Sequence, residues 1–284
     1  MARVMPMNGT PDADTGESRG EDARPRRGGK PPAGQPVIDR AFALLGAFDS
    51  DHRALSLAEL ARRGGIPRSS ALRLARSLVQ AGALERLDDG RFVVGLRLLE
   101  TASLAPRGHG LRAVAMPYME DLFHVTRQHV LLAVRDGQEA LLVERLSALD
   151  AGPVQYRVGG RLPLSDTGVG LVLLAFAPPA VQDHALAHYV PGRGHDAIDT
   201  PADLRRVLAE VRRSDFVLGR QSHPWPVSTV AAPVREGGEV VAALSVVAPS
   251  TGFADTGYGP AVRATARAVS RRLTEDRAGE APGG

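Results

Sequence analysis

The 284-residue chain contains no cysteine, a single lysine (Lys30) and no apolar run long enough to cross a membrane. The absence of cysteine excludes disulfides, thiolate metal sites and a cysteine nucleophile. A membrane-spanning helix needs about 20 consecutive apolar residues, and no run in the chain approaches this length. Polar residues appear within the first ten positions, so no signal peptide is predicted either. We therefore expect a cytoplasmic protein with no membrane partner.

Three sequence motifs of enzymes are also missing, namely GxSxG, the P-loop and GxGxxG. Their absence argues against hydrolase, nucleotide-phosphate and dinucleotide chemistry, because these motifs supply the backbone geometry that such reactions use. His184 and His188 have the i, i+4 spacing of a helical metal pair, but no cysteine or HExxH motif accompanies them. A surface pair is the favoured interpretation, so we predict no metal site, no cofactor and no enzyme.

Positive charge is concentrated in one part of the chain. The whole sequence carries a formal net charge of only +3, whereas the stretch 53–86 holds seven arginines and two glutamates. The planar guanidinium fork suits both phosphate and guanine. This local excess indicates a nucleic-acid contact.

Two short helices joined by a glycine turn are predicted in the same stretch, LAELARRGGIPRSSALRLARSLVQAG (57–82). Ser56 and Glu59 have the spacing of a capping box for the first helix, which Gly64 and Gly65 end. Pro67 opens the second helix, whose expected inward face is Leu72, Ala75, Leu78 and Val79.

Flanking segments complete the N-terminal domain. The apolar spacing after Pro36 predicts a helix ending near Ser50. After the helix pair, two short alternating runs surround the tight-turn signal Asp88-Asp89-Gly90, which predicts a hairpin. Three helices and a hairpin make a winged helix-turn-helix, in which one helix enters the major groove and the hairpin follows the backbone.

The second helix and the hairpin carry the candidate DNA contacts. Arg68, Ser69 and Ser70 lie at the N-terminus of the recognition helix, so we expect them to contact base edges. We expect the arginines further along the helix to contact phosphates. A solvated helix face is the alternative interpretation. The predicted DNA-binding residues are Arg68, Ser69, Ser70, Arg73, Arg76, Arg86 and Arg91.

The sequence after the predicted hairpin indicates a connecting helix followed by an α+β domain. Strand-like runs occur at 129–134, 139–145 and 154–158, and a clear hairpin pairs 228–234 with 240–248. Helices are predicted near 168–177, over 201–213 and over 256–276. The predicted divisions are a disordered arm (1–35), a winged helix-turn-helix (36–96), a linker helix region (97–110), an effector-binding and oligomerisation domain (111–277) and a disordered tail (278–284).

Four stretches together resemble the IclR family of bacterial transcriptional regulators, from about Pro36 to Arg277. They are VIDRAFALLGAF, the helix pair, RLPLSDTGVGLVLLA and VAAPVREGGEVVAALSVVAP. The resemblance implies an α+β fold with an N-terminal winged helix, a linker helix that dimerises, and a C-terminal GAF-like effector domain whose antiparallel sheet binds a small molecule. The effector-binding residues that it implies are Leu164, Ser165, Asp166, Thr167, Gly168, Trp225, Val227, Ser228 and Thr229.

The chain departs from the family pattern in this implied pocket. Leu171 stands where the family often has lysine, Thr229 replaces a frequent cysteine, and the segment LGRQSHPWP (218–226) has no carboxylate. The loop 165–168 could hold a carboxylate on its backbone N–H groups or simply cap the next helix. Trp225 could stack on a ligand or close the pocket, so the effector stays of unknown identity.

These features predict a ligand-responsive repressor that binds a double-stranded DNA operator as a homodimer or tetramer. One alternative keeps the DNA-binding head but gives the C-terminal domain a protein partner in place of a metabolite. A second is a small-molecule enzyme on a GAF-like scaffold, for which Ser165, Asp166 and Thr229 are the one catalytic set that the sequence offers.

Overall fold

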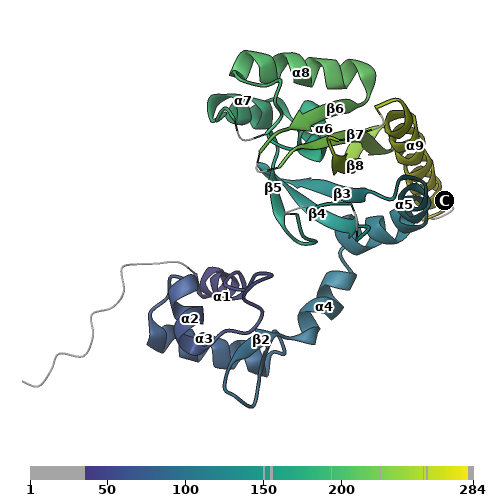
Figure 1. The fold of residues 1–284 in the computed structure, drawn as a ribbon. Helices are drawn as coiled ribbons and strands as arrows, with labels where there is room; N and C mark the ends of the chain where they lie inside the picture. The colour runs from purple at the N-terminus through teal and green to yellow at the C-terminus, as the bar shows by residue number, and fades with distance from the viewer. Residues whose placement is uncertain are drawn as a thin grey trace, which may run out of the picture.

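The computed structural model describes residues 36–149, 151–153, 156–192, 194–223, 225–251, 253 and 255–280. The predicted N-terminal arm (1–35) and the end of the predicted tail (281–284) lie outside these residues. Figure 1 shows a small N-terminal head, a larger C-terminal body and a helix between them. None of the helices in these ranges is long and apolar enough to span a membrane.

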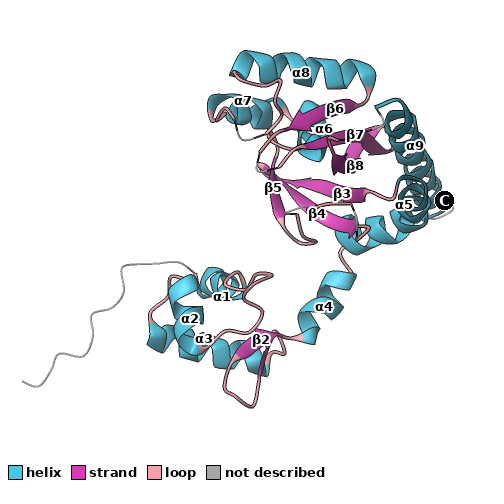
Figure 2. Ribbon diagram, in the orientation of Figure 1, coloured by secondary structure: helices cyan, strands magenta, loops and turns pink. Residues whose placement is uncertain are grey.

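The head is the predicted winged helix-turn-helix, with three helices and a two-stranded antiparallel hairpin (Figure 2). Its apolar faces meet in one core that includes Leu44, Leu60, Leu74 and Phe92. The elements are α1 (Val37–Leu45), α2 (Leu57–Arg63), α3 (Arg68–Gln80), β1 (Leu84–Arg86) and β2 (Phe92–Val94).

Local signals explain the start of α2. The Ser56 hydroxyl accepts a hydrogen bond from the Glu59 backbone N–H (3.3 Å), and the Glu59 carboxylate accepts one from the Ser56 N–H (2.8 Å). This reciprocal pair is the predicted capping box, and it satisfies two N–H groups that the helix itself leaves free. The helix ends at the Gly64-Gly65 turn, where Gly65 has the positive φ (63°) that glycine adopts without strain.

Two details of the head differ from expectation. α1 ends at Leu45 and not near Ser50, because the following backbone turns and Asp49 accepts the N–H groups of Asp51 and His52 (2.9 Å each). The His52 side chain also bonds to this carboxylate and is the main reason that the pKa of Asp49 lies at about 2.

The buried face of α3 is also shifted. Ala71, Leu74 and Ala75 are buried, whereas Leu72 is half-buried. Of the expected inward face, Ala75 is buried, and Leu78 and Val79 pack against the head core while partly exposed. The most buried positions are shifted by one residue from Leu72, because short apolar stretches leave the helical phase ambiguous.

A linker leads from the head to the body. α4 (Leu96–Ser103) is followed by the π-helical turn η1 (Pro106–Gly110), and α5 (Leu111–Thr126) continues from it. This turn separates α4 from α5 within the chain segment that leads to the body. Its proline lies at the first position, where the missing N–H costs no helical hydrogen bond.

The body is built on a six-stranded antiparallel sheet in the order β5-β4-β3-β8-β7-β6. Helices cover both of its faces (Figure 2). The strands are β3 (His129–Asp136), β4 (Glu139–Leu146), β5 (Arg161–Pro163), β6 (Val217–Gln221), β7 (Val227–Glu236) and β8 (Glu239–Pro249). The helices are α6 (Gly168–Ala175), α7 (Pro179–Ala187), α8 (Pro201–Ser214) and α9 (Asp255–Glu280).

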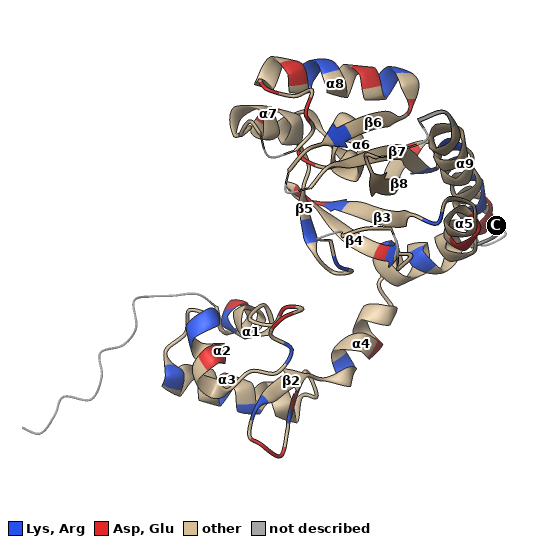
Figure 3. Cartoon of the chain, in the orientation of Figure 1, with Lys and Arg blue, Asp and Glu red and all other residues tan. Residues whose placement is uncertain are grey.

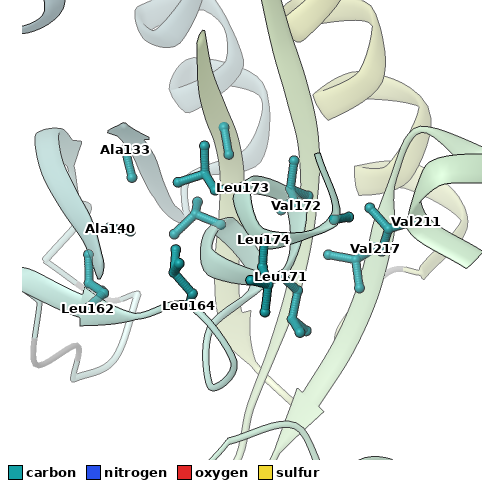
Figure 4. Close-up of a cluster of buried hydrophobic side chains, with 14 of the residues drawn as sticks. Ala133, Ala140, Leu162, Leu164, Leu171, Val172, Leu173, Leu174, Val211 and Val217 are labelled. Carbon is teal, nitrogen blue, oxygen red and sulfur yellow. The ribbon is translucent and has the colours of Figure 1, made fainter. Parts of the chain in front are cut away.

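The sheet separates two hydrophobic cores. Because successive side chains of a strand point to opposite faces, Leu131 and Ala133 join one core while Val130 and Leu132 join the other. Figure 4 shows the first core, in which Leu171 and Leu174 of α6 lie among residues of the sheet and of α8. The second core lies under α5 and α9.

Secondary structure at the sheet edges departs from the sequence-based expectation. No strand is assigned at 156–158, and the edge strand β5 forms a few residues later, at Arg161–Pro163. β6, at the opposite edge, was not predicted, because its sequence VLGRQ has a glycine and two polar residues in five. α9 extends to Glu280, so it includes the first three residues of the expected tail.

Candidate functional site

The exposed face of α3 carries the predicted DNA-reading side chains. Arg68, Ser69, Arg73 and Arg76 are exposed, and Ser70 is half-buried. Positions 69, 73 and 76 recur at helical spacing, opposite the buried alanines and Leu74. Packing of α3 on the head therefore leaves one polar, basic surface directed outward.

The arginines of this face carry uncompensated charge. Within the described part of the chain, Arg68, Arg73 and Arg76 form no ion pair and no side-chain hydrogen bond. Arg63 differs, since it binds the Asp49 carboxylate and donates to the backbone oxygen of Ala47 (2.6 Å). Arg63 thus holds the head together, whereas the α3 arginines are available to an anionic partner.

The two predicted arginines of the hairpin differ from each other. Arg91 donates from Nε to the Asp89 carboxylate (2.7 Å), and hydrogen bonds from Arg91, first its backbone N–H and then its side chain, lower the pKa of Asp89. The Arg86 guanidinium lies 5.9 Å from the centroid of the Phe92 ring. Arg86 keeps its charge uncompensated by any acid among the described residues, so it is the better candidate for a phosphate.

A pocket in the body lies between the start of α6 and the strands β3, β7 and β8. It is small, with a volume of about 30 Å³, which is room for one or two water molecules. Its lining is Leu131, Tyr156, Asp166, Thr167, Gly168, Val169, His195, Gly219, Arg220, Gln221, Val227, Thr229, Ser245 and Val247.

The structure brings together five of the nine predicted effector residues, which are Asp166, Thr167, Gly168, Val227 and Thr229. The other four do not line this pocket. Leu164 is buried in the core beneath it, and Ser165 donates a hydrogen bond to the Asp166 carboxylate (2.6 Å). Ser228 points to the opposite face of β7 and bonds to Ser250 (3.0 Å), and Trp225 is half-buried outside the lining.

The loop before α6 serves as a helix cap. The Thr167 hydroxyl accepts from the Gly170 N–H and donates to the Pro163 oxygen, both at 3.1 Å. Gly168 is pressed against Thr229, and a Cβ at this position would lie 2.7 Å from the Thr229 side chain. Capping therefore explains the Thr167 side chain, while glycine permits the close contact between α6 and β7.

Two buried hydroxyls form the polar part of the pocket floor. Thr229 Oγ1 and Ser245 Oγ are inaccessible to solvent and have no hydrogen-bond partner among the residues described. A buried polar group without a partner costs about 1–3 kcal/mol, so such atoms call for an explanation. These hydroxyls are suitably placed to bind a polar group of a ligand.

Sequence reasoning missed the residues that reach the pocket from distant segments. Tyr156 lies in the loop after β4, and burial, with a smaller contribution from Asp166, raises the pKa of its phenol. His195 accepts from the Ala197 N–H at Nδ1 and donates from Nε2 to the Leu218 oxygen (3.1 Å each). Ser245 shares the hairpin of Thr229, and its alternation along β8 was the one signal that could have located it.

The imidazoles of His184 and His188 stack with centroids 4.1 Å apart, and His188 Nδ1 bonds to the His184 backbone oxygen. Over the residues that the structure describes, no group of three or more His, Cys, Asp or Glu side chains could hold a metal ion. Both histidines are exposed.

Comparisons with known proteins match both parts of the chain to one family. Residues 37–88 match the IclR helix-turn-helix domain, and residues 105–271 match the C-terminal domain of bacterial transcriptional regulators of the IclR type. The repressor AllR of Escherichia coli is 25% identical over 268 residues, covering 87% of this chain and 96% of its own. The Pca operon regulatory protein of Acinetobacter baylyi is 27% identical over 219 residues, covering 75% of this chain and 78% of its own.

Solved structures agree with this match. An IclR homologue of Microbacterium hydrocarbonoxydans, crystallised in complex with 4-hydroxybenzoate, is 33% identical with a TM-score of 0.80. The alignment covers 84% of this chain and 100% of that one. The Thermotoga maritima protein shares the fold, with a TM-score of 0.65 at 23% identity.

We predict that Thr229→Val raises the stability of the body in the absence of added ligand. Valine keeps the shape of threonine and removes a buried hydroxyl that has no partner, so we expect a gain of about 1 kcal/mol, or about 2–4 °C in Tm. Thermal unfolding followed by circular dichroism measures the change.

Ser228→Ala is the matched control on the same strand, because the Ser228 hydroxyl is already bonded to Ser250. This variant is expected to lower Tm or leave it unchanged. Equal shifts for the two variants, or a lower Tm for Thr229→Val, would show that the Thr229 hydroxyl is satisfied in the folded protein.

Proposed function

The chain belongs to the IclR family of bacterial transcriptional regulators. We propose that it represses transcription by binding an operator, and that a small organic acid changes its affinity for this operator. It is a DNA-binding transcriptional regulator, as its relatives are, and not an enzyme. The enzymatic alternative considered from the sequence is therefore set aside. Repression is proposed because AllR and IclR of Escherichia coli are named repressors.

In this proposal α3 enters the major groove of the operator. Its exposed arginines without acid partners are the observation that carries the assignment, since a duplex offers phosphates and base edges at the right spacing. Arg68, Ser69 and Ser70 would contact base edges, while Arg73 and Arg76 would hold phosphates. The hairpin would follow the backbone through Arg86, with a smaller contribution from Arg91.

The effector would occupy the pocket between α6 and the sheet. Its walls are largely apolar, with Leu131, Val169 and Val247, and its floor has the two hydroxyls without partners. The first N–H groups of α6 and the Arg220 guanidinium suit a carboxylate. The relative bound to 4-hydroxybenzoate supports a small aromatic acid, which combines an apolar ring with polar groups at its ends.

A ligand of that size would have to enlarge the pocket. The volume of about 30 Å³ holds water molecules and not a benzene ring, so the segment that carries His195 would move outward on binding. A ligand changes operator occupancy only if it binds one arrangement of the heads better than another. Outward movement of the segment that carries His195 would be the first structural change by which the ligand favours one arrangement of the heads.

We also propose a homodimer formed through the head and linker. Large apolar side chains are exposed along α1 and α4, including Phe42 (67%), Leu96 (68%) and Leu99 (67%). Exposed apolar surface of this kind typically marks an interaction site. Two heads brought together would read the two halves of a palindromic or direct-repeat operator, and further pairing of the bodies would give a tetramer.

We predict that Arg73→Ala weakens binding to DNA from the region upstream of the gene by at least tenfold and lowers the slope of log K against log salt by about one. Arg68→Ala is expected to relax sequence preference more than it changes the salt slope. Fluorescence anisotropy at several salt concentrations measures both quantities.

The control is Arg206→Ala in α8, where the arginine is exposed and paired with Asp203. It should leave the affinity unchanged. Wild-type affinity in both Arg68→Glu and Arg73→Glu would contradict the assignment of α3 as the reading helix.

We predict that 4-hydroxybenzoate raises the Tm of the protein in a saturable way, with about 2.7 kcal/mol of stabilisation at one hundred times its Kd. Thr229→Val should weaken this effect. If neither this acid nor a panel of aromatic and short-chain carboxylates shifts Tm, the alternative in which the body binds a protein partner gains support.

We predict that Leu99→Asp converts a dimer into a monomer, because a carboxylate would be buried in the apolar interface. Sedimentation equilibrium measures the mass. Leu218→Asp, at an exposed leucine of β6, is the control and should sediment as the wild type does. A wild-type monomer at micromolar concentration would refute the proposed dimer, and a tetramer that Leu99→Asp splits into dimers would assign the linker one of two interfaces.

A further inference from the structure

A second cleft lies on the opposite face of the sheet from the effector pocket, between α9 and β7. Its volume is about 320 Å³, and it continues toward the β7–β8 turn. Figure 1 shows α9 running along this side of the sheet. The charged and polar side chains of the cleft are Asp215, Arg235, Arg263, Arg267, Ser270 and Arg271.

Three of these arginines follow one another on a single face of α9. Arg263, Arg267 and Arg271 are spaced four residues apart, so their side chains project from the same side at intervals of about 6 Å along the axis. Like charges at this spacing destabilise an isolated helix. Their alignment therefore has an energetic cost that a bound anion would offset.

The acids near α9 do not neutralise this row. Arg272 pairs with Asp276 (2.8 Å), and Arg277 lies 3.9 Å from Glu236, both outside the cleft. Within the part of the chain that the structure describes, Arg263, Arg267 and Arg271 have no ion pair. Of the residues described, Asp215 is the one carboxylate lining the part of the cleft between α9 and β7, and it is bonded to Arg235 (2.8 Å). Glu275 lines the part toward the β7–β8 turn and lies 3.9 Å from Arg272.

Aromatic rings hold two guanidinium groups in place. Arg263 lies 5.7 Å from the Phe216 ring centroid, and Arg235 lies 4.6 Å from that of Phe176. Stacking fixes the plane of a guanidinium, and N–H groups left free at its edge favour bidentate binding of oxyanions. Arg235 already donates to the Gly238 oxygen (3.1 Å) and to the Asp215 carboxylate (2.8 Å), whereas the Arg263 guanidinium makes no hydrogen bond to the residues described. The cleft floor between these groups is apolar, with Ala232, Pro233 and Ala266.

We propose that this cleft binds a small molecule that carries a di- or triphosphate group, as a second ligand site of the regulator. The row of cations calls for several linked phosphoryl groups and not one, because Arg263 and Arg271 are about 12 Å apart along the helix. The cleft volume lies at the lower end of small-molecule sites. A concave cleft of this size suits a free phosphorylated ligand better than the convex backbone of a duplex.

Inorganic tripolyphosphate is the probe, titrated into the full-length protein by isothermal calorimetry at physiological ionic strength, with pyrophosphate and monophosphate for comparison. We expect saturable binding, one site per chain, that weakens as the number of phosphoryl groups falls. The double substitution Arg267→Ala and Arg271→Ala should raise the Kd for tripolyphosphate at least tenfold. Both side chains are exposed, so the variant should fold, and an unchanged Tm verifies this.

Arg272→Ala is the matched control, since this arginine lies on the same helix but outside the cleft and is paired with Asp276. It should bind tripolyphosphate as the wild type does. No saturable binding, or equal weakening by the control and the double variant, overturns the proposal. Displacement of tripolyphosphate by a short duplex lacking the operator, at equal phosphate concentration, would also overturn it, by assigning the cleft to a nucleic-acid backbone.

The test is independent of the proposed regulatory function. Thr229→Val should leave tripolyphosphate binding unchanged, and the double variant should keep its response to 4-hydroxybenzoate. If 4-hydroxybenzoate does not bind, the proposed phosphate site is not affected. If tripolyphosphate does not bind, the proposed effector pocket is not affected.

Discussion

The antiparallel pairing of β3, β8 and β7 is the constraint on which the body depends. Leu131 pairs with Ser245, and Thr229 pairs with Val247, so these four side chains share the face that lies under α6. Their neighbours along the strands fill the core under α5 and α9. A slip of one residue would exchange the two faces, placing both hydroxyls in an apolar core and removing the pocket floor. Both faces are buried, and this fixes the register strongly.

Charge pairing distinguishes structural arginines from those available to a partner. Arg63 is bound by Asp49 and a backbone oxygen and joins two segments of the head, whereas the arginines of α3 point away from the core without an acid beside them. Figure 3 shows basic and acidic residues distributed over both parts of the molecule. Composition alone would therefore not identify the functional surface. The partners of each guanidinium separate the binding surface from the scaffold.

Features with local causes could be predicted from the sequence, and features assembled from distant segments could not. The capping box at Ser56, the head hairpin and the β7–β8 hairpin depend on neighbouring residues, and the structure has all three. Tyr156 and His195 reach the pocket through loops whose course depends on tertiary packing, so no spacing in the sequence indicated them. Ser228 was assigned to the pocket with Thr229, although adjacent strand residues must face opposite sides. That error came from treating a motif as a unit without applying the period of the strand.

If the effector pocket and the reading head are coupled, binding at each site changes the affinity of the other by the same factor. The measurement is the Kd for operator DNA with and without saturating effector, together with the Kd for effector with and without saturating operator. Linkage requires that the two ratios be equal, and a coupling of 1–3 kcal/mol corresponds to about 5–150-fold. We expect equal ratios in this range for the wild type. An effector that saturates the pocket while both ratios stay at one would contradict the coupling.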